Sequence, residues 1–240
     1  EDQDKFRYSG IFRDVLILLR PAQFVHDFTV TTPVNPEDKS ACVNVRFDRV
    51  EGNPPIDCQL LDAEGNSLCQ VAAKGAGISI PVDHPVLWNA EQPCLYTLKI
   101  STGDEVICQK VGIRDISIKD SVILINGKQV KFRGVNRHDS HPVTGASVTR
   151  EDVLRDLCLM KEHNINAIRT SHYPNAPWFP ELCSEYGFYV IAEADLESHG
   201  TGSIYQGTGG WADTFALLAQ DPAWAEAVLD RQKRNVIRDK

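Results

Sequence analysis

Three histidines follow strand-like segments in the second half of the chain. His138, His172 and His199 each come just after a short apolar run that has the length of a β-strand. In a parallel β/α barrel, the chemistry takes place at the carboxyl ends of the strands, in the loops that follow them. Imidazoles and neighbouring carboxylates at three successive strand ends therefore predict one wall of an active site.

Two of the candidate residues each allow two interpretations. His138 stands in the string Asn-Arg-His-Asp, which is difficult to place in a core, so it is either a site residue or a hydrogen-bonded loop residue. Arg169 lies at the mouth of the next strand, where its guanidinium can hold a carboxylate through a forked pair of hydrogen bonds. The alternative for Arg169 is a structural ion pair with Glu193 or Asp195.

Ionisable side chains crowd the end of the third strand. Carboxylates with one imidazole and no thiol favour a hard cation such as Mg²⁺ or Mn²⁺ over Zn²⁺, and the alternative is a solvated acidic loop. The glycines that follow predict a mobile loop, and they do not form a phosphate-binding pattern. The ionisable residues are Glu193, Asp195, Glu197 and His199, and the glycines are Gly200, Gly202, Gly207, Gly209 and Gly210.

Composition limits the class of protein. A chain of 240 residues with 42% hydrophobic residues can form one large domain or two ordinary ones. The net charge of −8 argues against nucleic acid and membrane surfaces as partners. No apolar run approaches the roughly 20 residues that span a bilayer. The seven cysteines are odd in number and form no C-x-x-C pair, so we expect reduced thiols and a cytoplasmic protein.

The sequence pattern changes near residue 118. Before it, short alternating runs separated by turn residues predict antiparallel strands, beginning with residues 15–19, and a β-sandwich. After it, Asn126 and Gly127 predict a two-residue hairpin turn. Thr149 with Asp152 three residues later predicts a capping box at the start of a helix.

Strands and helices then alternate, as is typical of parallel βα units. Strands are expected at residues 165–168 and 188–192, with helices at 177–186 and 222–240. A complete (β/α)8 barrel takes about 250 residues, and fewer than half that number follow residue 119. The sequence is therefore interpreted as a sandwich followed by the first part of a TIM barrel, in a piece of a longer protein.

Four strings carry a resemblance to a known family. They are YSGIFRDV at residues 8–15, RGVNRHDSHPVTG at 133–145, RTSHYPN at 169–175 and EADLESHG at 193–200. Together they resemble the glycoside hydrolase family two β-galactosidases of the bacterial lac type. The resemblance implies three parts: the tail of an N-terminal sugar-binding-like β domain at 1–20, an immunoglobulin-like β-sandwich at 21–117, and the first βα units of the (β/α)8 catalytic barrel at 118–240.

The resemblance also implies sugar contacts. Asp4 matches an aspartate that touches the sugar. His138 and His172 match two histidines that hydrogen-bond galactosyl hydroxyls, and Arg169 matches an arginine beside the nucleophilic carboxylate. The substrate implied is a terminal β-D-galactoside such as lactose.

Metal ligands are implied in the same way. Glu197 and His199 match two ligands of an active-site Mg²⁺, whose third protein ligand is a glutamate that this chain lacks. Asp4 matches a residue that helps to hold Na⁺. The resemblance therefore implies Mg²⁺ and Na⁺ as cofactors.

The family's two catalytic glutamates are expected beyond Lys240. One is an acid/base within an Asn-Glu pair and the other is the nucleophile, and no Asn-Glu pair occurs in the 240 residues. The fragment itself is therefore predicted to be inactive and to carry no catalytic residue, and the parent is expected to be a homo-oligomer. A β-glucuronidase or β-mannosidase of the same family, and a non-catalytic piece of a split enzyme, stay open as alternatives.

Overall fold

The computed structural model describes residues 9–35, 37–196, 198–204 and 211–240, which form two compact units. Leu16–Phe132 and Glu181–Tyr189 form one, here called the sandwich unit; Glu1–Val15, Arg133–Pro180 and Val190–Lys240 form the other, the parallel-sheet unit. The strands are β1 Phe24–Thr31, β2 Ala41–Glu51, β3 Asp57–Leu61, β4 Ser67–Ala72, β5 Gly77–Val82, β6 Tyr96–Ser101, β7 Val106–Val111, β8 Ile116–Lys119, β9 Val122–Ile125, β10 Lys128–Gln129, β11 Gly134–Arg137, β12 Ala167–Thr170 and β13 Tyr189–Ala192. The helices are α1 Arg150–Glu162, α2 Phe179–Tyr186, α3 His199–Ile204, α4 Trp211–Gln220, the 3-10 turn η1 Pro222–Trp224, and α5 Ala225–Arg238.

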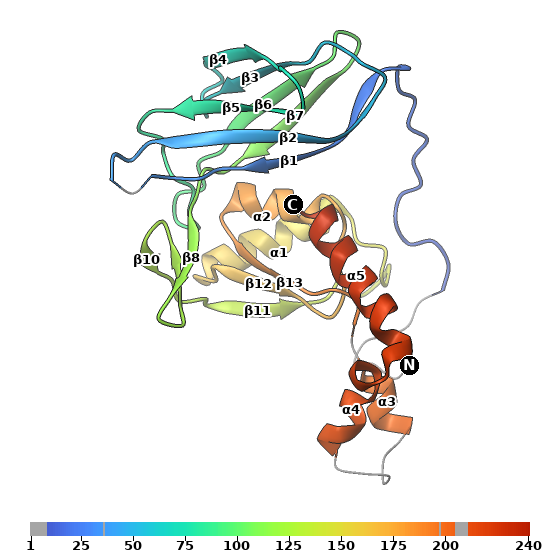
Figure 1. Ribbon diagram of the computed structural model, residues 1–240. Helices are drawn as coiled ribbons and strands as arrows, with labels where there is room; N and C mark the ends of the chain where they lie inside the picture. Colours follow the sequence, from blue (N-terminus) through green and yellow to red (C-terminus); the bar gives the residue numbers. More distant parts are fainter. Residues whose placement is uncertain (1–8, 36, 197, 205–210) are drawn as a thin grey trace. The chain divides into compact units, whose positions relative to one another are not determined.

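Two antiparallel sheets form the sandwich (Figure 1). One has the strand order β1-β2-β5 and the other the order β4-β3-β6-β7. Alternate residues of β6 are buried, so that Tyr96, Leu98 and Ile100 face the core while their neighbours are partly exposed. Apolar side chains from both sheets share one core, and removing this apolar area from water is what holds the sheets together.

The predicted hairpin follows the sandwich strands in the same unit. β8, β9 and β10 form an antiparallel meander, and Asn126 and Gly127 connect β9 to β10. Both residues have positive φ, 52° and 72°, as a type I′ turn requires. The side chain of Asn126 also accepts the backbone N–H of Asp115 at 3.0 Å, which joins the turn to the start of the meander.

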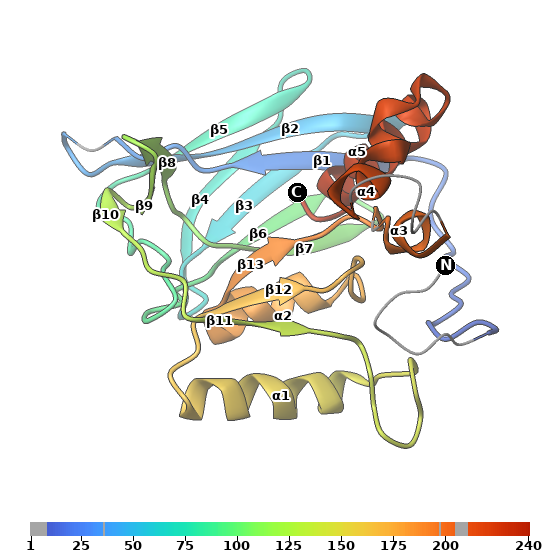
Figure 2. The ribbon, with the colours of Figure 1, turned by 90° about the horizontal axis from the view of Figure 1, so that it is seen from below.

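A short parallel sheet organises the second unit. Its order is β11-β12-β13, the arrows point the same way in Figure 2, and α1 runs along the sheet. The capping box at α1 is confirmed: the Thr149 hydroxyl accepts the N–H of Asp152, and the Asp152 carboxylate accepts the N–H of Thr149. Val153 and Leu157 are the buried residues of this helix. The predicted class, a β-sandwich followed by the first part of a TIM barrel, is confirmed, while the domain limits at residues 20 and 117 stay predictions.

Two local predictions are wrong. Residues 15–19 are not a strand, and their side chains are 75–91% exposed, because an apolar run forms a strand only where another strand accepts its backbone hydrogen bonds. The glycine-rich stretch is helical where it is described: Gly200 and Gly202 lie in α3. A methyl group at Gly202 would come within 2.6 Å of the Phe215 ring on α4, so glycine permits this close helix contact. Among the described residues, no helix is both long and apolar enough to cross a membrane.

Candidate active site

The carboxyl ends of the parallel strands bring the candidate residues together. The register of β11 and β12 places Arg137 opposite Thr170, the last residue of each strand. His138 follows β11 directly, His172 comes two residues after β12, and Glu193 follows β13 directly. Because these ends form a single edge of the sheet, the three side chains belong to one surface of the parallel-sheet unit.

Two histidines from different strands meet at this edge. The ring centroids of His138 and His172 lie 5.6 Å apart, and the rings are nearly perpendicular at 79°. The Nδ1 atom of His138 is buried and has no hydrogen-bond partner within the described parts of the chain. A buried ring nitrogen without a protein partner is a polar atom that a ligand hydroxyl can satisfy.

Glu193 holds the second histidine in place. The distance from His172 Nδ1 to Glu193 Oε2 is 2.8 Å. An ionised carboxylate can only accept a hydrogen bond, so His172 carries its proton on Nδ1, and this contact sets both the ring orientation and the tautomer. The backbone N–H of Glu193 donates to Thr170 Oγ1 at 2.9 Å, which ties the end of β13 to the end of β12.

Arg169 binds the other oxygen of the same carboxylate. Its Nε atom forms an ion pair with Glu193 Oε1, and its Nη1 donates to Asn136 Oδ1 at 3.3 Å. The ion pair with Glu193 that was one interpretation of Arg169 is therefore present. It does not remove Arg169 from the edge, because Glu193 is itself bonded to His172.

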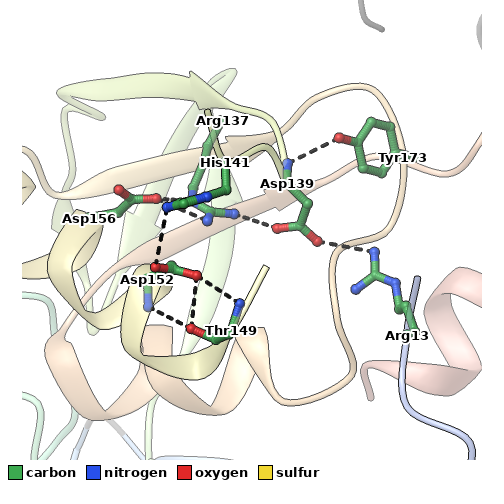
Figure 3. Close-up of polar contacts among 8 residues, drawn as sticks. All are labelled: Arg13, Arg137, Asp139, His141, Thr149, Asp152, Asp156 and Tyr173. Atoms are coloured by element: carbon green, nitrogen blue, oxygen red, sulfur yellow. Dashed lines mark hydrogen bonds and ion pairs between the residues drawn. The ribbon is translucent and has the colours of Figure 1, made fainter. Parts of the chain in front are cut away.

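Asp139, the residue after His138, links two arginines, and Figure 3 shows its carboxylate between their guanidinium groups. Its carboxylate accepts Arg137 Nη1 at 2.6 Å and Arg13 Nη2 at 3.0 Å. Arg137 also pairs with Asp156 of α1 at 3.0 Å. Arg137 and Asp139 are only 5% and 6% exposed, so these are buried charges, which proteins retain only when they are paired.

Tyr173 connects the two histidine-bearing turns. Its Oη atom accepts the backbone N–H of Asp139 at 3.0 Å, and its ring lies 6.0 Å from that of His138. Burial, and after it the charge of the Asp139 carboxylate, raises the pKa of Tyr173, so the phenol stays neutral. Arg13 Nη2 also donates to the carbonyl of Pro174 at 3.3 Å, and so touches both turns.

His141 shapes its own loop. Its Nδ1 atom accepts the backbone N–H groups of Val143 and Thr144, both at 3.2 Å. Its Nε2 atom lies 3.8 Å from Asp152, at the start of α1 (Figure 3). These contacts give His141 a structural role in the loop between β11 and α1.

Of the predicted metal ligands, His199 is the one that lies within the described residues. Asp4 and Glu197 lie outside the described residues. His199 begins α3, where its ring packs against Phe215 with centroids 5.5 Å apart. Within the described ranges, no three His, Cys, Asp or Glu side chains are grouped so as to hold a metal ion. Mg²⁺ and Na⁺ therefore stay predictions.

Both halves of the chain match models of a single family. Residues 23–114 match the model "Glycosyl hydrolases family 2". Residues 116–240 match "Glycosyl hydrolases family 2, TIM barrel domain". The chain belongs to glycosyl hydrolase family 2. The histidine pair and Glu193 accordingly lie at the carboxyl edge of strands from the family's barrel domain, which is where barrel enzymes carry their active sites.

Curated relatives of family 2 match this chain over nearly its whole length. The chain is 44% identical to the β-galactosidase of Actinobacillus pleuropneumoniae, over 100% of this chain and 26% of the relative. It is 41% identical to the β-galactosidase of Staphylococcus xylosus over 99% of this chain and 24% of the relative. The chain thus spans about a quarter of the length of these relatives.

Solved structures of family 2 glucuronidases are similar in fold. The β-glucuronidase of Ruminococcus gnavus in complex with uronic isofagomine has a TM-score of 0.78 and 26% identity, over 92% of this chain and 37% of that protein. The β-D-glucuronidase of Dictyoglomus thermophilum has a TM-score of 0.67 and 27% identity, over 72% of this chain and 30% of that protein.

Reasoning from the sequence missed several residues of this edge. Glu193 was seen as part of an acidic cluster, although its place directly after a strand could have singled it out. Tyr173 has no signal of its own in the sequence, and Asp139 stands only within the polar string Asn-Arg-His-Asp. Arg13 lies in the string at residues 8–15, but no local pattern indicates its pairing with Asp139, 126 residues away.

Proposed function

We propose that this chain forms part of a retaining β-galactosidase, in which His138 and His172 hydrogen-bond the hydroxyls of the galactosyl unit. The observation that carries the proposal is the convergence of both imidazoles at the carboxyl edge of barrel strands. Relatives named β-galactosidase, at 36–44% identity, support galactose as the sugar.

The geometry suits the recognition of a neutral sugar. Each sugar hydroxyl is both a donor and an acceptor, and so is a neutral imidazole through its two ring nitrogens. Glu193 already fixes the orientation of the His172 ring, so sugar binding does not have to restrict the ring further. Contacts of this kind raise the rate when they tighten as the oxocarbenium-like transition state forms.

Hydrolysis with retention needs two further carboxylates. They must lie about 5 Å apart across the glycosidic bond, one as the acid/base and one as the nucleophile. Glu193 is a poor candidate for either role, because Arg169 and His172 occupy its two oxygens. We therefore propose that the 240-residue chain alone does not hydrolyse β-galactosides. Turnover of a nitrophenyl β-galactoside by the purified chain would contradict this part of the proposal.

A β-glucuronidase is the second candidate, because the similar solved structures are glucuronidases. A glucuronide carries a carboxylate, which needs a cation that no protein carboxylate already neutralises. Arg169 is paired with Glu193. Arg13 and Arg137 are both paired with Asp139. The pairing of these arginines supports a neutral galactoside over a uronate.

A comparison of two substrates tests the proposal. Nitrophenyl β-galactoside and nitrophenyl β-glucuronide are to be hydrolysed by the full-length protein under the same conditions. We expect kcat/KM to be larger for the galactoside by about 100-fold, because leaving a buried polar or charged group unsatisfied costs about 1–3 kcal/mol. A larger kcat/KM for the glucuronide would overturn the assignment.

A further inference from the structure

Asp139 joins three segments that are distant in the sequence. Its two carboxylate oxygens bind Arg13, near the start of the described chain, and Arg137, the last residue of β11. Its backbone N–H donates to Tyr173, in the turn after β12. Figure 3 shows the carboxylate between the two guanidinium groups and the phenol at the backbone nitrogen.

These contacts involve the sequence neighbours of both histidines. Asp139 and Arg137 flank His138 on either side in the sequence, and Tyr173 directly follows His172. One of the bonds, from the Asp139 N–H to Tyr173 Oη, therefore acts on the backbone within one residue of His138. Arg13 also donates to the carbonyl of Pro174, the residue after Tyr173. Arg13 therefore binds both Asp139 and the turn that follows β12.

The ion pairs of Arg13 and Arg137 depend unequally on their carboxylate partners. Arg137 has two carboxylate partners, Asp139 and Asp156, and the Asp156 side chain is 44% exposed. The ion pair between Arg13 and Asp139 is the one carboxylate contact described for Arg13. Loss of the Asp139 charge would therefore remove the described ion pair of Arg13, whereas loss of the Asp156 charge would leave Arg137 paired with Asp139.

We propose that Asp139 is a positioning residue for His138 and His172. It does not touch the sugar; through Arg13, Arg137 and Tyr173 it holds the two imidazoles at the separation that the sugar hydroxyls require. The inference rests on the proposed sugar-binding role of the two histidines. A displacement of about 1 Å in such a contact can lower the rate about 100-fold.

A double-mutant cycle in the full-length protein tests this. Asp139→Asn, which keeps the shape and removes the charge, is made in the wild type and in the His138→Ala/His172→Ala background. We expect kcat/KM for nitrophenyl β-galactoside to fall about 30- to 100-fold in the wild type, mainly in kcat. In the double-alanine background the same change should cost less than about threefold, because the residues through which it acts are gone.

Two further variants keep the test decisive. Asp230→Asn makes the same chemical change in an exposed ion pair with Arg234 on α5, and it should leave kcat/KM unchanged. Tyr173→Phe removes the acceptor for the Asp139 N–H and takes the place of Asp139→Asn in the cycle if that protein does not fold.

The outcomes separate the two proposals. Equal losses in both backgrounds, or no loss in the wild type, would overturn the positioning role and leave the proposed function standing. If the His138→Ala/His172→Ala protein itself retained full kcat/KM, the sugar contacts would be wrong, and the positioning role would fall with them.

Discussion

The two units bury different kinds of side chain. The sandwich core contains Leu60, Leu98 and Ile100, each 0% exposed, whereas the parallel-strand edge buries Arg137 and Asp139. Among the described buried polar and charged residues, Thr102 alone belongs to the sandwich unit. Apolar burial stabilises a fold without specifying chemistry, while buried charges stabilise little and hold particular geometries. The difference indicates that the sandwich unit is built for stability and the edge for placing functional groups.

The largest effect is expected in the sandwich. Leu98→Ala leaves a cavity between the sheets and should lower the free energy of unfolding by about 2–5 kcal/mol, measured by urea denaturation. Activity per folded molecule should not change. Lys99→Ala, on the opposite face of the same strand, is the control and should have a small effect. A loss below about 1 kcal/mol for Leu98→Ala would mean that this core is not closely packed.

The second-largest effect is expected at the parallel-strand edge, where activity should fall far more than stability. His172→Ala removes a proposed sugar contact and should lower kcat/KM for a nitrophenyl β-galactoside about 100-fold, which corresponds to about 2.7 kcal/mol of transition-state binding. Stability should fall by much less. His26→Ala, an exposed histidine of β1, is the matched control. If both variants were equally active, the edge would not bind the substrate.

The smallest effect is local and depends on pH. Thr149→Ala removes the N-cap of α1 and should lower the free energy of unfolding by about 1 kcal/mol at neutral pH.

Hydrogen bonds from the backbone and side chain of Thr149 lower the pKa of Asp152 in the folded chain. Its contribution is therefore complete above the unfolded pKa, near 4, and is lost as the pH falls through the lower folded value. The stability difference between wild type and Asp152→Asn should shrink below about pH 4. Glu151→Gln, in the same first turn, serves as the control, and a difference that grew on acidification would contradict the capping role.

Local signals could be predicted from the sequence, and long-range pairings could not. The capping box of Thr149 and Asp152 and the turn at Asn126 depend on residues a few positions apart, so their patterns are visible in the sequence. The pairing of Arg13 with Asp139 spans 126 residues, and no local pattern encodes it.

The candidate site shows the same limit. Strand-end positions were enough to select His138 and His172, because parallel strands end at one edge. The sharing of Glu193 between Arg169 and His172 depends on side-chain geometry, which periodicity does not report. The helix that contains Gly202 is not visible in the local sequence, because glycine has a low helix propensity and the close contact with Phe215 comes from a different segment of the chain.

A crystal structure of the full-length protein with bound galactose tests the central claim most directly. The account predicts a nitrogen of both His138 and His172 within about 2.7–3.2 Å of sugar hydroxyl oxygens, with Glu193 still bonded to His172. Galactose bound at a distance from both imidazoles would contradict it.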